Sequence, residues 1–152
     1  IYTRSEILQP QYISADSIVE RSIIGEGTTV LGKVYNSVIG CGVTIGENTV
    51  VRDSIIMNRT EIGRGCELYK AIIAEDAVLG DGVKLGIGDE TENETDPHIY
   101  NHGIVTIGEK SVVPPGITVG KNSVIFGRTV QTDYADNYLA GGKTLIKAGD
   151  ET

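Results

Sequence analysis

Aromatic residues are few in this sequence of 152 residues, which has no Trp, a single Phe and seven Tyr. A core without large rings must be built from aliphatic side chains, so the spacing of Ile, Val and Leu carries the information on fold. No apolar run approaches the roughly 20 residues that a membrane-spanning helix needs. The two cysteines, Cys41 and Cys66, are too few for a disulfide framework, and we expect free thiols in a reducing cytoplasm.

Positive charge is also scarce, because 21 Asp and Glu residues outnumber 13 Lys and Arg residues. The formal net charge of −8 repels nucleic acid and anionic membranes, so we expect neither as a partner. The sequence begins with Ile1 instead of Met and has no secretion signal. We therefore expect a single domain that is part of a longer cytoplasmic protein.

A repeat of 17 residues organises the middle of the chain. Segments 37–53, 54–70 and 71–87 superimpose without a gap, and within each an aliphatic residue recurs every six positions, often followed by Gly. A step of six excludes an amphipathic helix, whose apolar face recurs every three or four residues. It also excludes a long hairpin strand, because Gly, Asn or Asp interrupts each run after a few residues.

The workable geometry is a coil of three short strands and three tight corners, with the aliphatic side chains pointing inward. Equivalent residues of successive coils then stack about 4.8 Å apart, with backbone hydrogen bonds between coils. We predict three stacked core columns: Ile39, Ile56 and Ile73; Ile45, Ile62 and Leu79; Val51, Leu68 and Leu85. We also predict an outer column of alternating charge at Glu47, Arg64 and Asp81.

The spacing resembles the hexapeptide repeat of left-handed β-helix proteins. This resemblance implies an all-β fold, a single-stranded left-handed parallel β-helix; its handedness comes from the resemblance alone, since parallel crossovers are otherwise right-handed. One coil is two residues short, and we place the deletion at the corner around Gly32-Lys33. The predicted divisions are a linker leading into the first coil at 1–17, the β-helix at 18–127 with an acidic loop insertion at 88–103, and a C-terminal cap or tail at 128–152.

The inserted loop is rich in carboxylates that cannot line an apolar core, namely Asp89, Glu90, Glu92, Glu94 and Asp96. We expect a solvated or partly disordered loop, with contact to a partner subunit as the alternative. On this hypothesis, replacing Glu94 changes the free energy of unfolding by no more than about a few tenths of a kcal/mol. In the cap, Tyr134, Tyr138, Leu139, Leu145 and Ile146 are expected to cover the open end of the core.

Motifs for catalysis are scarce. A catalytic triad, Cys-x-x-Cys and His-Glu-x-x-His are missing, and Gly142-Lys143-Thr144 lacks the upstream glycine of a phosphate-binding loop. The two histidines, His98 and His102, both fall in the inserted loop. Hexapeptide acyltransferases use a histidine on or beside such a loop as general base, so an acyltransferase is one alternative, and a pair of ordinary surface histidines is the other. Two histidines do not make a three-histidine metal site, and we predict no metal in this chain.

Further stretches resemble bacterial ADP-glucose pyrophosphorylases (glucose-1-phosphate adenylyltransferases). Pro10-Gln-Tyr-Ile13, together with Ile1-Tyr-Thr3, is similar to that family's linker between its catalytic and C-terminal domains. The stretches that look like its C-terminal repeats are Asn36-Ser-Val-Ile39, Asp53-Ser-Ile-Ile-Met57 and Lys70-Ala-Ile-Ile73. Other sugar-1-phosphate nucleotidyltransferases have similar tails, so the C-terminal domain of one of these is a further alternative.

The resemblance implies that a catalytic domain lies upstream and is missing from this sequence. The whole protein would join ATP and glucose 1-phosphate into ADP-glucose and pyrophosphate for glycogen synthesis, with Mg²⁺ in that catalytic domain. We predict no catalytic residue and no cofactor in the chain itself, and an inactive fragment. In the family, the β-helix packs on the catalytic domain, builds a homotetramer and shares the site for an allosteric effector.

Effectors of this family are phosphorylated sugars and nucleotides, whose binding needs Arg or Lys donors. The resemblance points to Lys110, which follows the stretch 103–105, as an effector-binding residue, and Lys121 is a weaker, geometric candidate. Asp76 stands where certain members have a basic residue, and this leaves the identity of the effector open. The alternatives are that both lysines are ordinary solvated side chains, and that the chain is a scaffold without a phosphate ligand.

Overall fold

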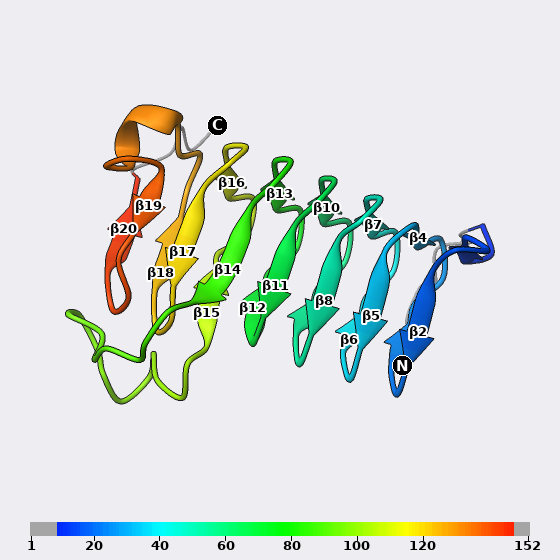
Figure 1. Ribbon diagram of the computed structural model, residues 1–152, viewed down its shortest axis with the longest axis horizontal. Coiled ribbons are helices and arrows are strands. Elements are labelled where there is room, and N and C mark those ends of the chain that lie inside the picture. Colours follow the sequence, from blue (N-terminus) through cyan, green and yellow to red (C-terminus); the bar gives the residue numbers. More distant parts are fainter. Residues whose placement is uncertain (1–8, 148–152) are drawn as a thin grey trace, which may run out of the picture.

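The computed structural model describes residues 9–147, which wind into a rod with three long sides (Figure 1). Each coil adds one short strand to each of three parallel sheets, so that paired strands are usually three elements apart in the sequence. Backbone hydrogen bonds therefore run from one coil to the next along the rod. The fold is the all-β, left-handed parallel β-helix that the hexapeptide resemblance implied.

The sheets are named A, B and C in the order in which a coil visits them. Sheet A contains β1 (Tyr12–Ile13), β4 (Thr29–Val30), β7 (Thr44–Ile45), β10 (Glu61–Ile62), β13 (Val78–Leu79) and β16 (Val112–Val113). Sheet B contains β2 (Ile18–Glu20), β5 (Lys33–Tyr35), β8 (Val50–Arg52), β11 (Glu67–Tyr69), β14 (Lys84–Ile87), β17 (Thr118–Gly120) and β19 (Tyr138–Leu139). Sheet C contains β3 (Ile23–Ile24), β6 (Val38–Ile39), β9 (Ile55–Ile56), β12 (Ala71–Ile73), β15 (Val105–Ile107), β18 (Val124–Phe126) and β20 (Thr144–Ile146).

A short 3-10 helix, η1 (Gln131–Asp133), follows β18 near the C-terminal end of the rod. Among residues 9–147, no helix has the length and the apolar character needed to cross a membrane.

The strand register confirms the three predicted core columns. In sheet C, Ile56 pairs with Ile39 on one side and with Ile73 on the other. Sheets A and B hold the other two columns in the same way. All of these side chains are at most 2% exposed, so every coil contributes to one continuous core. Burying each aliphatic contributes about 1.5–3 kcal/mol before the conformational entropy is subtracted.

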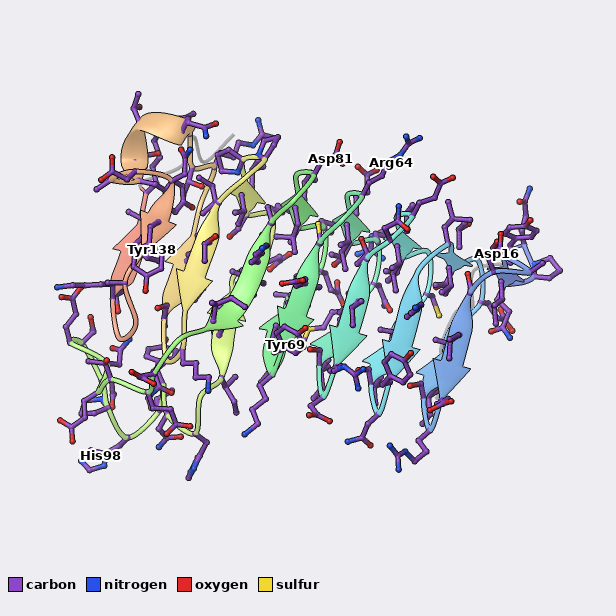
Figure 2. The ribbon with its side chains drawn as sticks, viewed as in Figure 1. Asp16, Arg64, Tyr69, Asp81, His98 and Tyr138 are labelled. Atoms are coloured by element: carbon purple, nitrogen blue, oxygen red, sulfur yellow. The ribbon has the colours of Figure 1, made fainter. Side chains whose placement is uncertain are left out.

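The predicted outer charge column lies at the corner between sheets A and B, where Figure 2 shows Arg64 and Asp81 pointing away from the rod. Asp81 Oδ1 accepts a hydrogen bond from the backbone N–H of Arg64 at 2.8 Å. The carboxylate therefore binds the main chain of the preceding coil, a contact that the charge pattern did not predict.

The coil that is two residues short lies where the sequence analysis predicted it, around Gly32 and Lys33. Val30 pairs with Ile45, 15 positions on, but Lys33 pairs with Val50, 17 positions on. The two missing residues therefore belong to the corner at 31–32. This recessed corner leaves an open hollow of about 410 Å³ between the corners of the neighbouring coils.

Strands extend beyond the predicted limits of the β-helix, 18–127, at both ends. β1 lies in the segment predicted as a linker and pairs with β4, while β19 and β20 lie in the predicted cap and pair with β17 and β18. The last pairings step by 20 residues instead of 17, so a fixed repeat length could not reveal them. The parts of the predicted linker and tail at 1–8 and 148–152 lie outside the described residues.

Only some of the side chains that were expected to cover the open end of the core do so. Tyr134 is 5% exposed, and Leu139 and Leu145 pack against the core. Tyr138 and Ile146 are 45% and 65% exposed, and Figure 2 shows Tyr138 outside sheet B. Their predicted role in the cover is wrong, because side chains alternate along a strand and each is next to an inward leucine.

Candidate functional site at the corner beside the inserted loop

The inserted loop leaves the rod between sheets B and C and rejoins it after residues 88–104 (Figure 1). Ala71 pairs with Val105 across the insertion, 34 positions on instead of 17, so the loop has the length of one coil. Residues 88–104 form no strand. The loop therefore places side chains that the six-residue pattern does not constrain beside a regular corner of the rod.

Two buried asparagines hold the loop against the last coils. Asn93 is 3% exposed and donates from Nδ2 to the Asn122 carbonyl oxygen at 2.8 Å. Asn122 is 5% exposed; it donates from Nδ2 to the Thr91 carbonyl oxygen at 3.0 Å and accepts from the Gly103 N–H at 2.8 Å. The loop is solvated, as expected, because most of its side chains are exposed, but these two amides give its backbone a defined path, which the disordered alternative did not anticipate.

Glu94 makes contacts that sequence reasoning missed. Its Oε1 accepts from the Thr144 N–H at 3.0 Å, and its Oε2 accepts from Lys143 Nζ at 3.1 Å. The hydrogen bond from the Thr144 N–H, with that from Lys143, lowers the pKa of Glu94. Glu94 is solvated but also bridges the loop to the last coil, and the small effect expected of its replacement stays a prediction.

An open hollow of about 290 Å³ lies where the loop rejoins sheet C. It is lined by three aliphatic and three ionisable side chains: Ile55, Ile72, Ile104, Asp53, Lys70 and His102. Apolar walls with a few polar groups are typical of sites that bind an organic molecule or a protruding side chain. Lys70 is a cation that sequence reasoning did not select. The sequence could have indicated Lys70, because the 17-residue repeat places Lys70 in one corner column with Asn36 and Asp53.

A second hollow, of about 280 Å³, lies within the loop and includes Glu90, Glu92, Tyr100 and His102 among its lining residues. Its carboxylates make it a poor receptor for a phosphate group, because like charges repel. The apolar hollow has one carboxylate, Asp53, beside one ammonium group, Lys70, and is therefore the better of the two candidates for an anionic ligand.

The two candidate bases of the acyltransferase alternative are both exposed. Figure 2 shows His98 at the far edge of the loop, pointing away from the sheets, whereas His102 lines both hollows. Within residues 9–147, neither imidazole hydrogen-bonds another protein group. An oriented base normally has such a partner, so the geometry adds no support to this alternative, which stays a prediction.

The structure does not bring the two predicted effector lysines together. Lys110 is exposed at the corner between sheets C and A, where its N–H donates to the Glu75 carbonyl oxygen at 3.0 Å. Lys121 lies at the corner between sheets B and C, where its carbonyl oxygen accepts from the Gly142 N–H at 2.8 Å. Lys121 therefore lies at the same corner of the rod as Lys70, whereas Lys110 lies at a different corner, between sheets C and A.

Lys110 lies near Asp76, a carboxylate that is already paired with Arg59. Arg59 donates to Asp76 Oδ1 at 2.8 Å and to Glu75 Oε2 at 3.1 Å. The hydrogen bond from Arg59 lowers the pKa of Asp76, and the ammonium group of Lys110 lowers it further. These exposed pairs contribute little to stability, but Asp76 competes with any phosphate for Lys110.

Metal and thiol chemistry find little support in this part of the chain. Residues 9–147 contain no group of three or more His, Cys, Asp or Glu side chains arranged to hold a metal ion. Cys41 and Cys66 are free thiols, as expected. Burial raises the pKa of the Cys66 thiol, which keeps it neutral and a weak nucleophile.

The three-sided parallel coil, with an aliphatic residue at every sixth position and a loop at one corner, defines the class: the chain is a hexapeptide-repeat β-helix. A family model described as "GlmU-like, C-terminal hexapeptide" matches residues 10–107. The chain belongs to this family.

Curated relatives match nearly all of the chain. The glucose-1-phosphate adenylyltransferase of Lachnospira eligens is 53% identical over 150 residues, which make up 99% of this chain and 36% of the relative. The protein of the same name from Acetivibrio thermocellus is 37% identical over 150 residues, 99% of this chain and 35% of the relative. The chain therefore spans about a third of the length of these relatives.

A solved structure, the acetyltransferase domain of PglB from Neisseria gonorrhoeae, has a TM-score of 0.51 at 18% identity. The match covers 88% of this chain and 56% of that one. At this identity the likeness supports the fold alone.

Proposed function

We propose that this chain is the regulatory and oligomerisation domain of a glucose-1-phosphate adenylyltransferase. The observation that carries the proposal is the 53% identity to one such protein over 99% of the chain but 36% of the relative. A rod with a continuous aliphatic core and charged corners suits a part that assembles and regulates an enzyme.

On this proposal the whole protein, meaning the longer polypeptide that contains this chain, also has an N-terminal catalytic part. That part would join ATP and glucose 1-phosphate to give ADP-glucose and pyrophosphate, with Mg²⁺ bound there. The product would serve glycogen synthesis in the cytoplasm. The whole protein would be a homotetramer, and the chain by itself would be inactive.

The effector on this proposal is a phosphorylated sugar or nucleotide, bound in part by Lys110 or Lys121. Each lysine has a carboxylate nearby, since Glu90 lies beside Lys121 at Gly103, but Lys121 shares its corner of the rod with a second cation, Lys70. Lys110 has Asp76 beside it, and a neighbouring carboxylate opposes the approach of a phosphate. We therefore expect Lys121 to contribute more to effector binding than Lys110.

Isothermal titration of the whole protein with fructose 1,6-bisphosphate and with AMP tests this role. We expect Lys121→Gln to weaken effector binding by about ten- to a hundredfold, since a charge-assisted hydrogen bond contributes about 1.5–3 kcal/mol. Lys33→Gln on the outer face of sheet B is the matched control and should leave the affinity unchanged.

Failure of both ligands to bind the whole protein would contradict the effector role. Equal affinities in the Lys121→Gln variant and the parent would remove Lys121 from the site. Binding of acetyl-CoA in place of these ligands would favour the acyltransferase alternative.

A further inference from the structure

The two-residue deletion leaves a gap in a column of stacked turns. At the corner between sheets A and B, the turns Ala15-Asp16 and Glu47-Asn48 flank a coil that has no such turn. Gly32 is buried at this point, and a Cβ atom on it would collide with the Thr49 carbonyl oxygen, so the chain passes close to the next coil. The open hollow of about 410 Å³ is the space of the missing turn, and we call it the notch.

The missing turn also interrupts a ladder of backbone hydrogen bonds. In the regular coils, the second residue of a turn donates to the first residue of the preceding turn; the Gly65 N–H, for example, donates to the Glu47 carbonyl oxygen at 2.9 Å. Within residues 9–147, the Asn48 N–H has no such acceptor and the Ala15 carbonyl oxygen has no such donor. The notch therefore presents a free backbone donor on one wall and a free backbone acceptor on the other.

The side chains of the notch are mixed in character. They supply two carboxylates, a hydroxyl group, an ammonium group and two half-buried aliphatic groups, which belong in that order to Asp16, Glu47, Ser14, Lys33, Leu31 and Val50. Figure 2 shows Asp16 at the corner near one end of the rod. The volume lies within the range of roughly 300–1,000 Å³ that is usual for sites that bind small molecules. The notch therefore has the size and the mixed lining of a small-molecule site.

The charges of the notch select against ions. Its carboxylates outnumber its single ammonium group, so it repels a phosphate group, and this distinguishes the notch from the proposed effector site. Residues 9–147 hold no group of His, Cys, Asp or Glu side chains arranged for a metal ion, here or elsewhere. A neutral ligand that both donates and accepts hydrogen bonds matches the notch better, and hydroxyl groups do both.

The width of the notch limits the ligand to a single layer. The two flanking turns are two coil steps apart, which is about 10 Å, so the space that the missing turn leaves between them is about one step, or 5 Å. A pyranose ring fits within such a layer, with the hydroxyl groups at its rim directed to the two walls. Its C–H groups then lie against the aliphatic side chains of Leu31 and Val50.

We propose that the notch binds a neutral sugar, with one pyranose ring held between the two flanking turns. Ring hydroxyl groups accept from the Asn48 N–H and donate to the Ala15 carbonyl oxygen and to the carboxylates of Asp16 and Glu47. The ligand thus makes the hydrogen bonds that the missing turn would have made. The inference goes beyond the proposed function and does not depend on it, because every group involved belongs to this chain.

Titration of the ¹⁵N-labelled chain with glucose and with maltose, followed by the NMR shifts of its backbone amides, tests the proposal. We expect saturable shifts of the Gly32 and Asn48 amides, with a dissociation constant of about 1–10 mM, because a small ligand in an open site binds weakly. The amide of Ile73, in the core several coils away, should not shift. Fructose 1,6-bisphosphate at the same concentrations should leave the notch amides in place.

Two variants and a matched control locate the site. Insertion of Asn-Gly between Leu31 and Gly32 restores the 17-residue step and fills the notch with a turn, so sugar binding should be lost while the other coils keep their amide shifts. Glu47→Ala leaves the notch open and should weaken sugar binding about tenfold, because it removes a charge-assisted hydrogen bond. Glu61→Ala, on the outer face of sheet A, is the control and should bind sugar as the parent does.

Three results overturn the proposal. The first is that the notch amides do not shift with either sugar, or shift in proportion to its concentration without saturating. The second is that the Glu47→Ala variant binds sugar as tightly as the parent. The third is that fructose 1,6-bisphosphate shifts the notch amides at lower concentrations than maltose does, because the notch then selects an anion and not a neutral sugar.

Discussion

Replacing Ile56 with Asp places a carboxylate in the middle of the core. Ile56 is 1% exposed and stacks between Ile39 and Ile73. Its neighbour Ile55 belongs to the same strand but points outward and is 44% exposed. The two positions therefore allow one substitution to be compared on opposite faces of a single strand.

The expected magnitudes differ by about an order. Loss of the apolar contacts of Ile56 costs about 2–5 kcal/mol, as in other large-to-small core substitutions. The buried carboxylate adds to this cost, or takes up a proton to avoid part of it. The total is on the order of 5 kcal/mol, close to the whole stability of a typical domain. Ile55→Asp has neither effect and should change the free energy of unfolding by no more than about 0.5 kcal/mol.

Urea denaturation of the chain, followed by circular dichroism, measures both variants. We expect Ile56→Asp to be unfolded or to have a strongly lowered midpoint, and Ile55→Asp to unfold near the parent midpoint. Ile56→Val should lose only about 0.5–1.5 kcal/mol. An Ile56→Asp variant with the parent midpoint, or an Ile55→Asp variant that unfolds just as easily, would refute the assignment of inner and outer faces.

Asn122→Ala leaves the Gly103 N–H without its acceptor, so we expect a loss of about 1–3 kcal/mol and faster cleavage of loop 88–104 by a Glu-specific protease; unchanged cleavage would contradict the anchoring. Hydrogen bonds lower the pKa of three carboxyl groups, Asp76, Glu94 and Asp133. Each contributes stability above its unfolded-state pKa that is lost as the pH falls through the folded-state pKa, so the urea midpoint should fall in acid, and less so in Glu94→Gln. Iodoacetamide near neutral pH should modify Cys41 before Cys66, because burial raises the pKa of the Cys66 thiol; mass spectrometry showing the reverse order would contradict its burial.

The core could be predicted from the sequence because one physical requirement repeats in every coil. An inward side chain must be aliphatic and must stack on its equivalent, so the six-residue step located Ile39, Ile56 and Ile73 without further information. The same comparison of coil lengths located the two-residue deletion between Val30 and Lys33. The handedness needed the family resemblance, since spacing alone does not determine it.

The candidate site could be predicted less well, because its contacts do not repeat. Asn93 and Asn122 are 29 residues apart and outside any periodic pattern, so nothing in the sequence indicated that they anchor the loop. Glu94 looked like its acidic neighbours until its bonds to the last coil were known. The pattern also identifies only the inward residue of an Ile-Ile pair and says nothing about the role of the outward Ile55, which is 44% exposed.

We propose that this chain regulates and assembles an adenylyltransferase but does not itself catalyse the formation of ADP-glucose. The most direct test is to measure ADP-glucose made from ATP and glucose 1-phosphate by the chain alone and by the whole protein, with and without a phosphorylated effector. We expect no product from the chain, and product from the whole protein at a rate that the effector changes. Turnover by the chain alone, or a whole protein that makes no ADP-glucose, would contradict the claim.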